Sequence, residues 1–189
     1  MIPYFALALL PLLAPSPVDP DTRLDVTLAA FDAQCALLDS VDGLAARAET
    51  AEWAAFTPDA DSSAGKLLTI TQNAAEKSGV ALDARTFRNV AAYGDRVLFL
   101  AQVSATAGAG SVECRILDET GSAPDVEALT QWAGRAPQVR TLPSGAASWF
   151  WPGGVRVDAN FTVALHVEPG TSAAQGGVGL QIASARVTR

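Results

Sequence analysis

Two cysteines, Cys35 and Cys114, constrain the fold of this chain more than any other feature of its sequence. Around Cys35, apolar residues recur at steps of three and four, which is the spacing of one face of a helix. Those residues are Leu24, Leu28, Phe31 and Leu38. Around Cys114, the apolar residues Val112 and Ile116 alternate with charged residues, as they would in a strand. Both sulfur atoms are therefore expected where a helix packs on a sheet.

A disulfide between Cys35 and Cys114 is the default interpretation if the chain is exported, because disulfides persist in oxidising compartments. It would close a loop of about 80 residues and contribute about 4.5 kcal/mol in the chain-entropy account. Two separate buried thiols are the alternative for a cytosolic protein. A catalytic thiol is a third interpretation. The predicted core position of Cys114 and its distance in sequence from the only histidine, His166, disfavour it.

The N-terminal region resembles a targeting segment. Residues 4–14 form an apolar run with the length of the hydrophobic part of a signal peptide, and the run is too short to span a bilayer. We predict a removable signal peptide over residues 1–18 and a mature chain in the periplasm or outside the cell. No Lys or Arg precedes the run, and Pro17 follows the candidate cleavage residues Ala14 and Ser16. The alternatives are a buried N-terminal strand or a wrongly assigned start.

Composition excludes several classes of protein. The 189 residues suit one domain, predicted over residues 19–189, and 49% apolar residues with a net charge of −7 argue against disorder. Thirteen Lys and Arg against twenty Asp and Glu leave no basic surface for nucleic acid. One histidine and two cysteines exclude zinc sites built mainly from those residues. We predict a soluble mature chain with no membrane span, no metal and no cofactor.

The order of the predicted elements indicates an α+β fold. Helices are predicted over 22–41, 42–53 and 123–134, and strands over 66–71, 86–93, 96–104, 111–118, 145–151, 155–158, 160–168 and 178–187. Residues 72–84 favour neither state. Short turns with glycine join the strands between 86 and 118 into an antiparallel meander. Strands without regular helical crossovers predict an antiparallel sheet in one domain, packed by the N-terminal helix and the mid-chain helix.

A few residues define these elements. The run 97–100 is apolar on both faces, which predicts a central strand. Gly43 is interpreted as the break between the first two helices. The helix over 123–134 is predicted to begin at a Ser122 cap and to end at Gly134. Its inward stripe is predicted to be Val126, Leu129 and Ala133.

Trp149, Phe150 and Trp151 form the most distinctive string and precede a Pro-Gly-Gly turn. In a strand both tryptophans share one face, and Phe150 takes the other. If one of these faces is exposed, the string is a candidate interaction surface for a sugar or a protein. The alternative is that the tryptophans pack under the helix over 123–134 while Phe150 covers an edge.

Two sequence patterns match parts of catalytic motifs, but neither motif is complete. Ser63 and Lys66 match the S-x-x-K spacing of penicillin-binding enzymes, in which the serine opens a helix. Here the pair is placed in a turn-rich segment, the stretch over 57–65 that predicts a loop, and no S-D-N or K-T-G follows. His166 could join an acid and a serine in a triad, but its strand position predicts the wetter face of the sheet.

The pairing of Phe31-x-x-x-Cys35 with the run Cys114–Asp118 and the helical segment Val126–Trp132 resembles small exported bacterial proteins of unknown function. The resemblance covers most of the mature chain. It implies residence in the periplasm and transfers no catalytic residue.

The leading hypothesis is therefore a non-catalytic, disulfide-stapled domain that binds a protein or a cell-envelope component. The first alternative is a small hydrolase that uses His166 or Ser63 in a dispersed site. The second is an acidic cytosolic binding protein, such as a secretion chaperone, which requires that the N-terminal run is retained and that both cysteines are reduced.

Overall fold

The computed structural model describes residues 20–89, 91–105, 108–121, 123–141, 147–155, 162–167 and 179–188. The predicted signal peptide over residues 1–18 lies outside the described residues. The described elements are α1 (Pro20–Gln34), α2 (Val41–Thr50), β1 (Ala54–Ala55), α3 (Ser63–Ser78), β2 (Ala81–Asn89), β3 (Arg96–Ser104), β4 (Gly110–Asp118), α4 (Val126–Ala133), β5 (Gln138–Thr141), β6 (Ala147–Pro152), β7 (Thr162–Val167) and β8 (Leu180–Thr188).

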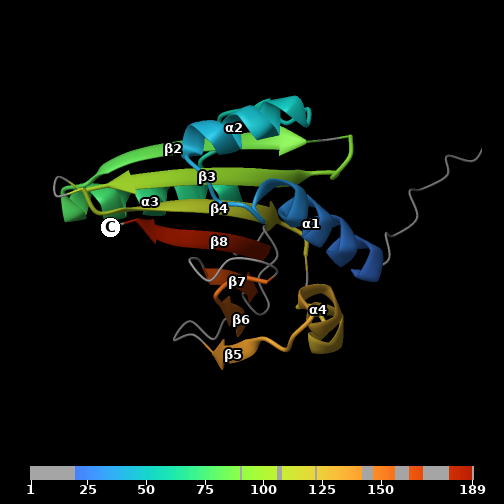
Figure 1. The fold of residues 1–189 in the computed structure, drawn as a ribbon. Helices are drawn as coiled ribbons and strands as arrows, with labels where there is room; N and C mark the ends of the chain where they lie inside the picture. Colours follow the sequence, from blue (N-terminus) through green and yellow to red (C-terminus); the bar gives the residue numbers. More distant parts are fainter. Residues whose placement is uncertain are drawn as a thin grey trace, which may run out of the picture.

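The described strands form one antiparallel sheet with the order β1-β2-β3-β4-β8-β7-β6-β5 (Figure 1). Helices α1 and α2 lie on one face, and α3 lies on the opposite face, behind β3 and β4 in this view. Strand β8 comes last in the chain but pairs between β4 and β7, so it joins two meanders into one sheet. The predicted α+β fold with an antiparallel sheet is confirmed.

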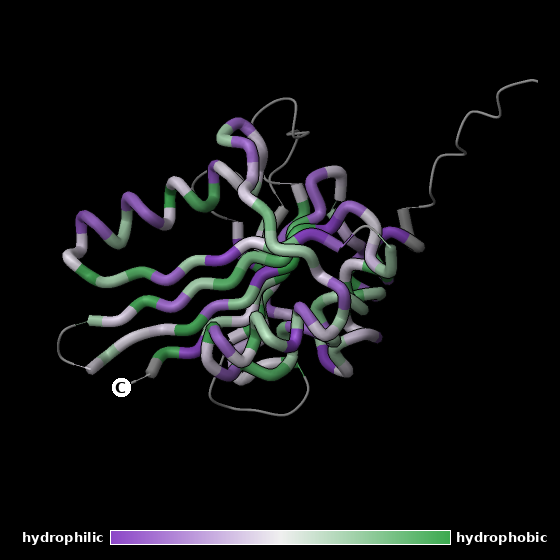
Figure 2. The backbone as a smooth tube through the Cα atoms, turned by 90° about the horizontal axis from the view of Figure 1, so that it is seen from above, coloured by the Kyte–Doolittle hydropathy of each residue, from purple (hydrophilic) through white to green (hydrophobic). Residues whose placement is uncertain are grey.

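The central strand β3 is buried on both faces, as its sequence predicts. Leu98 and Leu100 lie in the larger core, beneath α1 and α2, whereas Val97 and Phe99 pack in a smaller core against α3. Figure 2 shows the strands between these helical layers, with hydrophobic and hydrophilic residues alternating along them. Both cores depend on this period of two, because successive side chains of a strand point to opposite faces.

The first two helices are separated earlier than the sequence suggests. Helix α1 ends at Gln34, so the predicted helix over 22–41 is too long. Ser40 caps α2, since its side chain accepts a hydrogen bond from the backbone N–H of Gly43. Gly43 therefore lies inside the first turn of α2, and the break falls at residues 35–40. A glycine inside a helix costs only about 1 kcal/mol, which an N-cap serine can offset.

The strand predicted over 66–71 is wrong, because these residues lie in α3. Ser62 caps this helix by accepting from the N–H of Gly65, and Gly79 ends it in a left-handed conformation with φ of 63°. Leu67 packs in the smaller core, and Thr69 and Thr71 bond back to the preceding turn. The loop expected over 57–65 accordingly stops at the cap. Packing and capping outweigh the β propensity of the threonines and Ile70.

Helix α4 is shorter than predicted. Its N-cap is Asp125, so the expected start at a Ser122 cap is wrong, whereas its end at Gly134 is confirmed. Leu129 and Ala133 are buried, but Val126 is 43% exposed and does not belong to the inward stripe. The short edge strand β5 was not predicted, and the strand expected over 86–93 begins and ends earlier, as β2.

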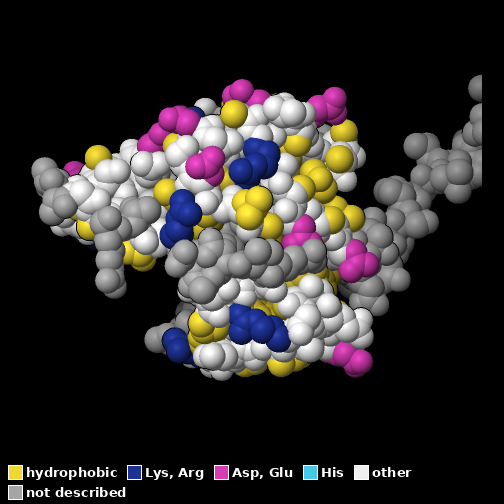
Figure 3. Space-filling view, viewed as in Figure 1, with side chains coloured by type: hydrophobic (Ala, Val, Ile, Leu, Met, Phe, Trp, Pro, Cys, Tyr) yellow, Lys and Arg dark blue, Asp and Glu magenta, His cyan; other side chains and the backbone are white. Residues whose placement is uncertain are grey.

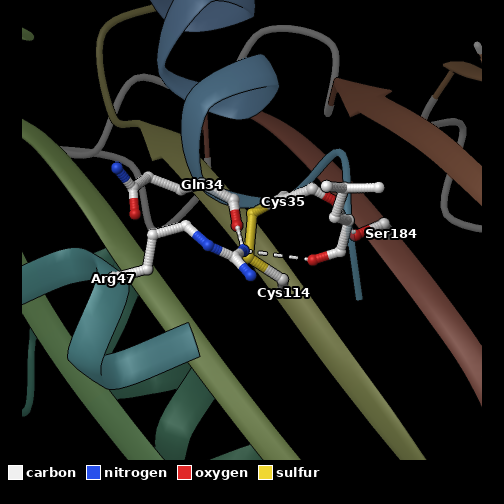
Figure 4. Close-up of a disulfide and its surroundings, with 6 residues drawn as sticks. Gln34, Cys35, Arg47, Cys114 and Ser184 are labelled. Carbon is white, nitrogen blue, oxygen red and sulfur yellow. Dashed lines mark hydrogen bonds between the residues drawn. A yellow bond between two sulfur atoms is a disulfide. The ribbon is translucent and has the colours of Figure 1, made fainter. Parts of the chain in front are cut away.

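The predicted disulfide between Cys35 and Cys114 is confirmed (Figure 4). It joins the residue that follows α1 to the middle of β4, with 5.3 Å between the Cα atoms, and both cysteines are fully buried. Two further bonds hold the chain leaving α1. Ser184 of β8 donates its hydroxyl to the carbonyl of Cys35 at 2.8 Å, and Arg47 of α2 donates to the carbonyl of Gln34 at 3.0 Å.

Within the described ranges, no helix combines the length and the apolar character needed to cross a membrane.

Candidate functional site

The two tryptophans of the aromatic string belong to the core. Trp151 is fully buried and Trp149 is 6% exposed. The Trp151 ring meets the edge of Trp132 of α4 with 5.7 Å between centroids, and its Nε1 donates to the carbonyl of Arg135 at 3.1 Å. An interaction surface built on Trp149 and Trp151 is therefore corrected to the alternative, in which they pack beside α4. Phe150 is half-buried, and a guanidinium stacks over its ring.

The S-x-x-K pair lies at the start of a helix, which the sequence did not predict. Ser63 is the first residue of α3, and Lys66 follows one turn later, half-buried. The backbone N–H of Ser63 donates to Oε1 of Glu119 at 3.0 Å. Ser63 is only 1% exposed, so a substrate does not reach its hydroxyl in this conformation. His166 lies in β7, where its backbone pairs with Ser148 and Gln181.

A buried ion cluster joins α1 to the strands. The carboxylate of Asp118, at the end of β4, is 1% exposed and lies 2.6 Å from Arg23 of α1 and 2.9 Å from Arg96 of β3. Thr27 also donates its hydroxyl to this carboxylate. Burial alone would raise the pKa of Asp118, but the hydrogen bonds from Arg23 and the positive charge of Arg96 outweigh burial and lower that pKa.

The charged groups of this cluster bind one another and nearby backbone atoms. Arg96 also donates to the carbonyl of Arg23 at 2.7 Å, and Asp118 accepts from the backbone of Thr120. Burial lowers the pKa of Arg96, while the attraction of Asp118 opposes that change. These contacts fasten α1 across the ends of β3 and β4, which is a structural role. Among the described residues, no group of three or more His, Cys, Asp or Glu side chains could hold a metal ion.

The outer edge of β2 is open, because its neighbour β1 is only two residues long. β1 pairs with Phe87 and Arg88, and then Phe56 donates its N–H to the carbonyl of Thr86. Backbone groups of alternate residues point to the same side of a strand. Since the Thr86 carbonyl points outward, the N–H and C=O groups of Leu82 and Ala84 also point outward. None of the described residues offers these groups a backbone partner on that side.

Two hollows follow one another along this edge. The first, of about 480 Å³, lies where the chain after β1 leaves the sheet, and its lining includes Glu49 of α2 and Leu68 of α3. The second, of about 490 Å³, lies between β2 and Gln72, Ala75 and Glu76 of α3. Ala84 lines both hollows. We name this continuous feature the β2 slot: residues 80–87 form its floor, and α2 and α3 form its walls.

The two sides of the β2 slot differ in chemistry. Leu82 and Ala84 point toward α3 and pack against the smaller core. Asp83 and Arg85 point toward α2, where Arg85 donates to Asp83 at 2.7 Å and to Asp42 at 2.6 Å. These hydrogen bonds, first that to Asp83, raise the pKa of Arg85 above its ordinary value. The slot can therefore offer backbone hydrogen bonds to an extended ligand, with an apolar floor bordered by Gln72 and Glu76 on the side toward α3 and charged groups on the side toward α2.

The sequence did not reveal the β2 slot. Its edge depends on how far β1 pairs, and a two-residue strand has no period that can be recognised. A usable signal was present in Gly79, a helix-ending glycine that precedes the alternation of Leu82 and Ala84 with Asp83 and Arg85. That alternation marks a strand with one apolar and one charged face.

No family model matches this chain, and neither the curated proteins nor the solved structures include a significant match.

Proposed function

We propose that this chain is an exported, disulfide-stapled domain that binds a protein partner without catalysis, and that the β2 slot receives an extended segment of that partner. The observation that carries the proposal is the open edge of β2 between two helical walls. Strand addition to such an edge supplies affinity through backbone hydrogen bonds and specificity through alternate side chains. An edge without a partner strand is also a feature that proteins usually shield.

Export is supported by the fully buried disulfide, since such bonds are rare in proteins of a reducing cytosol. The apolar run over residues 4–14 and the resemblance to small exported bacterial proteins support the same compartment. The cytosolic alternative requires reduced cysteines and has less support. The hydrolase alternative has the helical placement of Ser63 in its favour and the burial of that residue against it.

A proline at position 84 tests the proposed site. At an edge residue whose N–H faces outward, proline preserves the sheet but removes the donor that an added strand needs. Peptides selected from a displayed library on the wild-type protein are expected to lose at least tenfold in affinity for Ala84→Pro. They are expected to keep their affinity for Ala84→Ser, which retains the N–H. Thermal melts of both variants establish that the fold is intact.

The proposal is overturned if no peptide is enriched, or if the selected peptides bind Ala84→Pro as tightly as the wild type. Either result would show that the open edge does not receive a strand.

A further inference from the structure

We infer that the segment bound in the β2 slot is a cationic strand, in which Lys or Arg residues alternate with apolar residues. This inference rests on the proposed function and concerns the chemistry of the partner. An added strand continues the sheet, so the residues opposite Leu82 and Ala84 share their face, and the intervening residues share the face of Asp83 and Arg85. The two faces of the slot therefore select two kinds of side chain.

The face toward α3 selects apolar side chains. A guest residue opposite Leu82 or Ala84 meets the partly buried Leu68 and the buried Ala75, and it extends the smaller core. Apolar area that two surfaces remove from water contributes roughly 25 cal/mol per Å² before the entropic terms that oppose binding. Small aliphatic guest residues suit this face, because they would lie beside the side chains of Leu82 and Ala84.

The face toward α2 selects positive charge. The carboxylates of Glu49 and Asp83 and the guanidinium of Arg85 line this side, while a third carboxylate, Glu76, lines the side toward α3. Arg85 is engaged by Asp83 and Asp42 together, so the one guanidinium on this side faces three carboxylates when Glu49 is included. Figure 3 shows acidic side chains along the upper rim of this view, over α2 and β2. The chain as a whole carries a charge of −7, which adds a long-range attraction for a basic segment.

A second copy of this chain could pair with the β2 edge in more than one antiparallel register. With Ala84 opposite itself, Asp83 would face Arg85 of the other copy, whose guanidinium is already held by Asp83 and Asp42 of its own chain. With Leu82 opposite Ala84, each Asp83 would lie opposite its equivalent. Like charges directly opposite one another destabilise a strand pair. A basic segment instead presents Lys or Arg to Asp83 and Glu49.

The test uses synthetic peptides with blocked ends and the full disulfide-bonded protein. The basic peptide alternates four lysines with three valines, and the acidic peptide has glutamate in place of each lysine. A third peptide repeats the basic sequence with N-methyl groups on the backbone nitrogens of its valines, which removes donors needed for pairing. Fluorescence anisotropy is measured at low salt and at about 0.5 M salt, where exposed charges are strongly screened.

We expect the basic peptide to bind at least tenfold more tightly than the acidic peptide and to weaken severalfold in high salt. N-methylation and Ala84→Pro should each reduce binding at least tenfold. The variant Glu49→Gln should weaken binding about threefold to fivefold, whereas Glu127→Gln removes an exposed carboxylate outside the slot and should leave binding unchanged.

The outcomes separate the two claims. If the acidic peptide binds as tightly as the basic one, and both lose binding to Ala84→Pro, the cationic partner is excluded while the slot stands. If the basic peptide binds Ala84→Pro and the wild type equally, the slot itself is excluded. Concentration-dependent dimerisation that Ala84→Pro abolishes would assign the edge to a second copy and overturn the inference.

Discussion

Asp118 is a buried carboxylate that two guanidinium groups keep charged. Removing one member of a buried ion cluster leaves the others without compensation, which typically destabilises a protein by about 3–5 kcal/mol. We expect Asp118→Asn to lose a free energy of unfolding of this size, because Arg96 stays buried without its partner. Denaturant unfolding of the wild type and the variant measures this loss of free energy. Asp42→Asn is the control, because the Asp42 side chain is 84% exposed. If this variant loses more than about 1 kcal/mol of unfolding free energy, the loss in Asp118→Asn cannot be assigned to burial of the ion pair.

The lowered pKa of Asp118 predicts a dependence on acid. The folded state holds this pKa below the ordinary value of an aspartate, so below about pH 4 the unfolded state binds the proton more readily. The stabilisation is complete above that range and is lost as the pH falls through the folded pKa. Denaturant midpoints measured from pH 7 to pH 2 should fall more steeply for the wild type than for Asp118→Asn. Parallel curves would contradict this assignment.

Trp151 tests whether the aromatic string serves the core or a surface. Its side chain is fully buried against Trp132, so Trp151→Ala should destabilise the protein by about 3–5 kcal/mol. Phe150→Ala, at a half-buried neighbour, should cost clearly less. Thermal and denaturant unfolding provide both values. A stable Trp151→Ala protein would restore a role for this string in binding.

At the scale of elements, the disulfide fastens the end of α1 to β4, and it closes a loop with a sequence separation of 79 residues. The double variant Cys35→Ser with Cys114→Ser should lose about 2–5 kcal/mol of unfolding free energy, because its unfolded chain is less constrained. Denaturant unfolding of the oxidised wild type and the variant gives the difference. Equal stabilities would mean that the ion cluster and the core alone hold α1 in place.

The elements also show where sequence reasoning succeeds. The bounds of β3 are those predicted, because a short apolar run between glycine-containing turns is typical of a strand buried on both faces. The strand expected over 66–71 became part of α3, since the caps at Ser62 and Gly79 act on a segment longer than the apolar run. β1 was not predicted, because this strand is defined by its pairing with Phe87 and Arg88 rather than by a pattern in its own two residues.

The candidate site was less predictable than the fold for the same reason. Trp149 and Trp151 have distinctive residue types but lie in the core, whereas Leu82 and Ala84 are ordinary residues at an exceptional position. The role proposed for Leu82 and Ala84 follows from the early departure of the neighbouring chain after Phe56. A sequence records side chains, while an open edge is a property of backbone groups that lack a neighbour.

At the scale of the whole molecule, export has a direct measurement. Intact mass of the protein from each cell fraction of its native host should show loss of roughly the first 16–20 residues. Alkylation without a reducing agent should leave both cysteines unmodified, since they are paired. Full-length protein in the cytosol with two alkylated cysteines would remove the argument for export and favour the cytosolic alternative.

The position of β8 in the chain determines when the sheet can be completed during synthesis. Every other described strand precedes it in the chain, yet it supplies the only strand that bridges β4 and β7 among the described residues. A chain that emerges from its amino end can therefore complete this sheet only after β8 has been synthesised. Non-local pairing of this kind also slows folding. Until β8 has been made, the strands β1–β4 and β5–β7 lack the strand that joins them into one sheet.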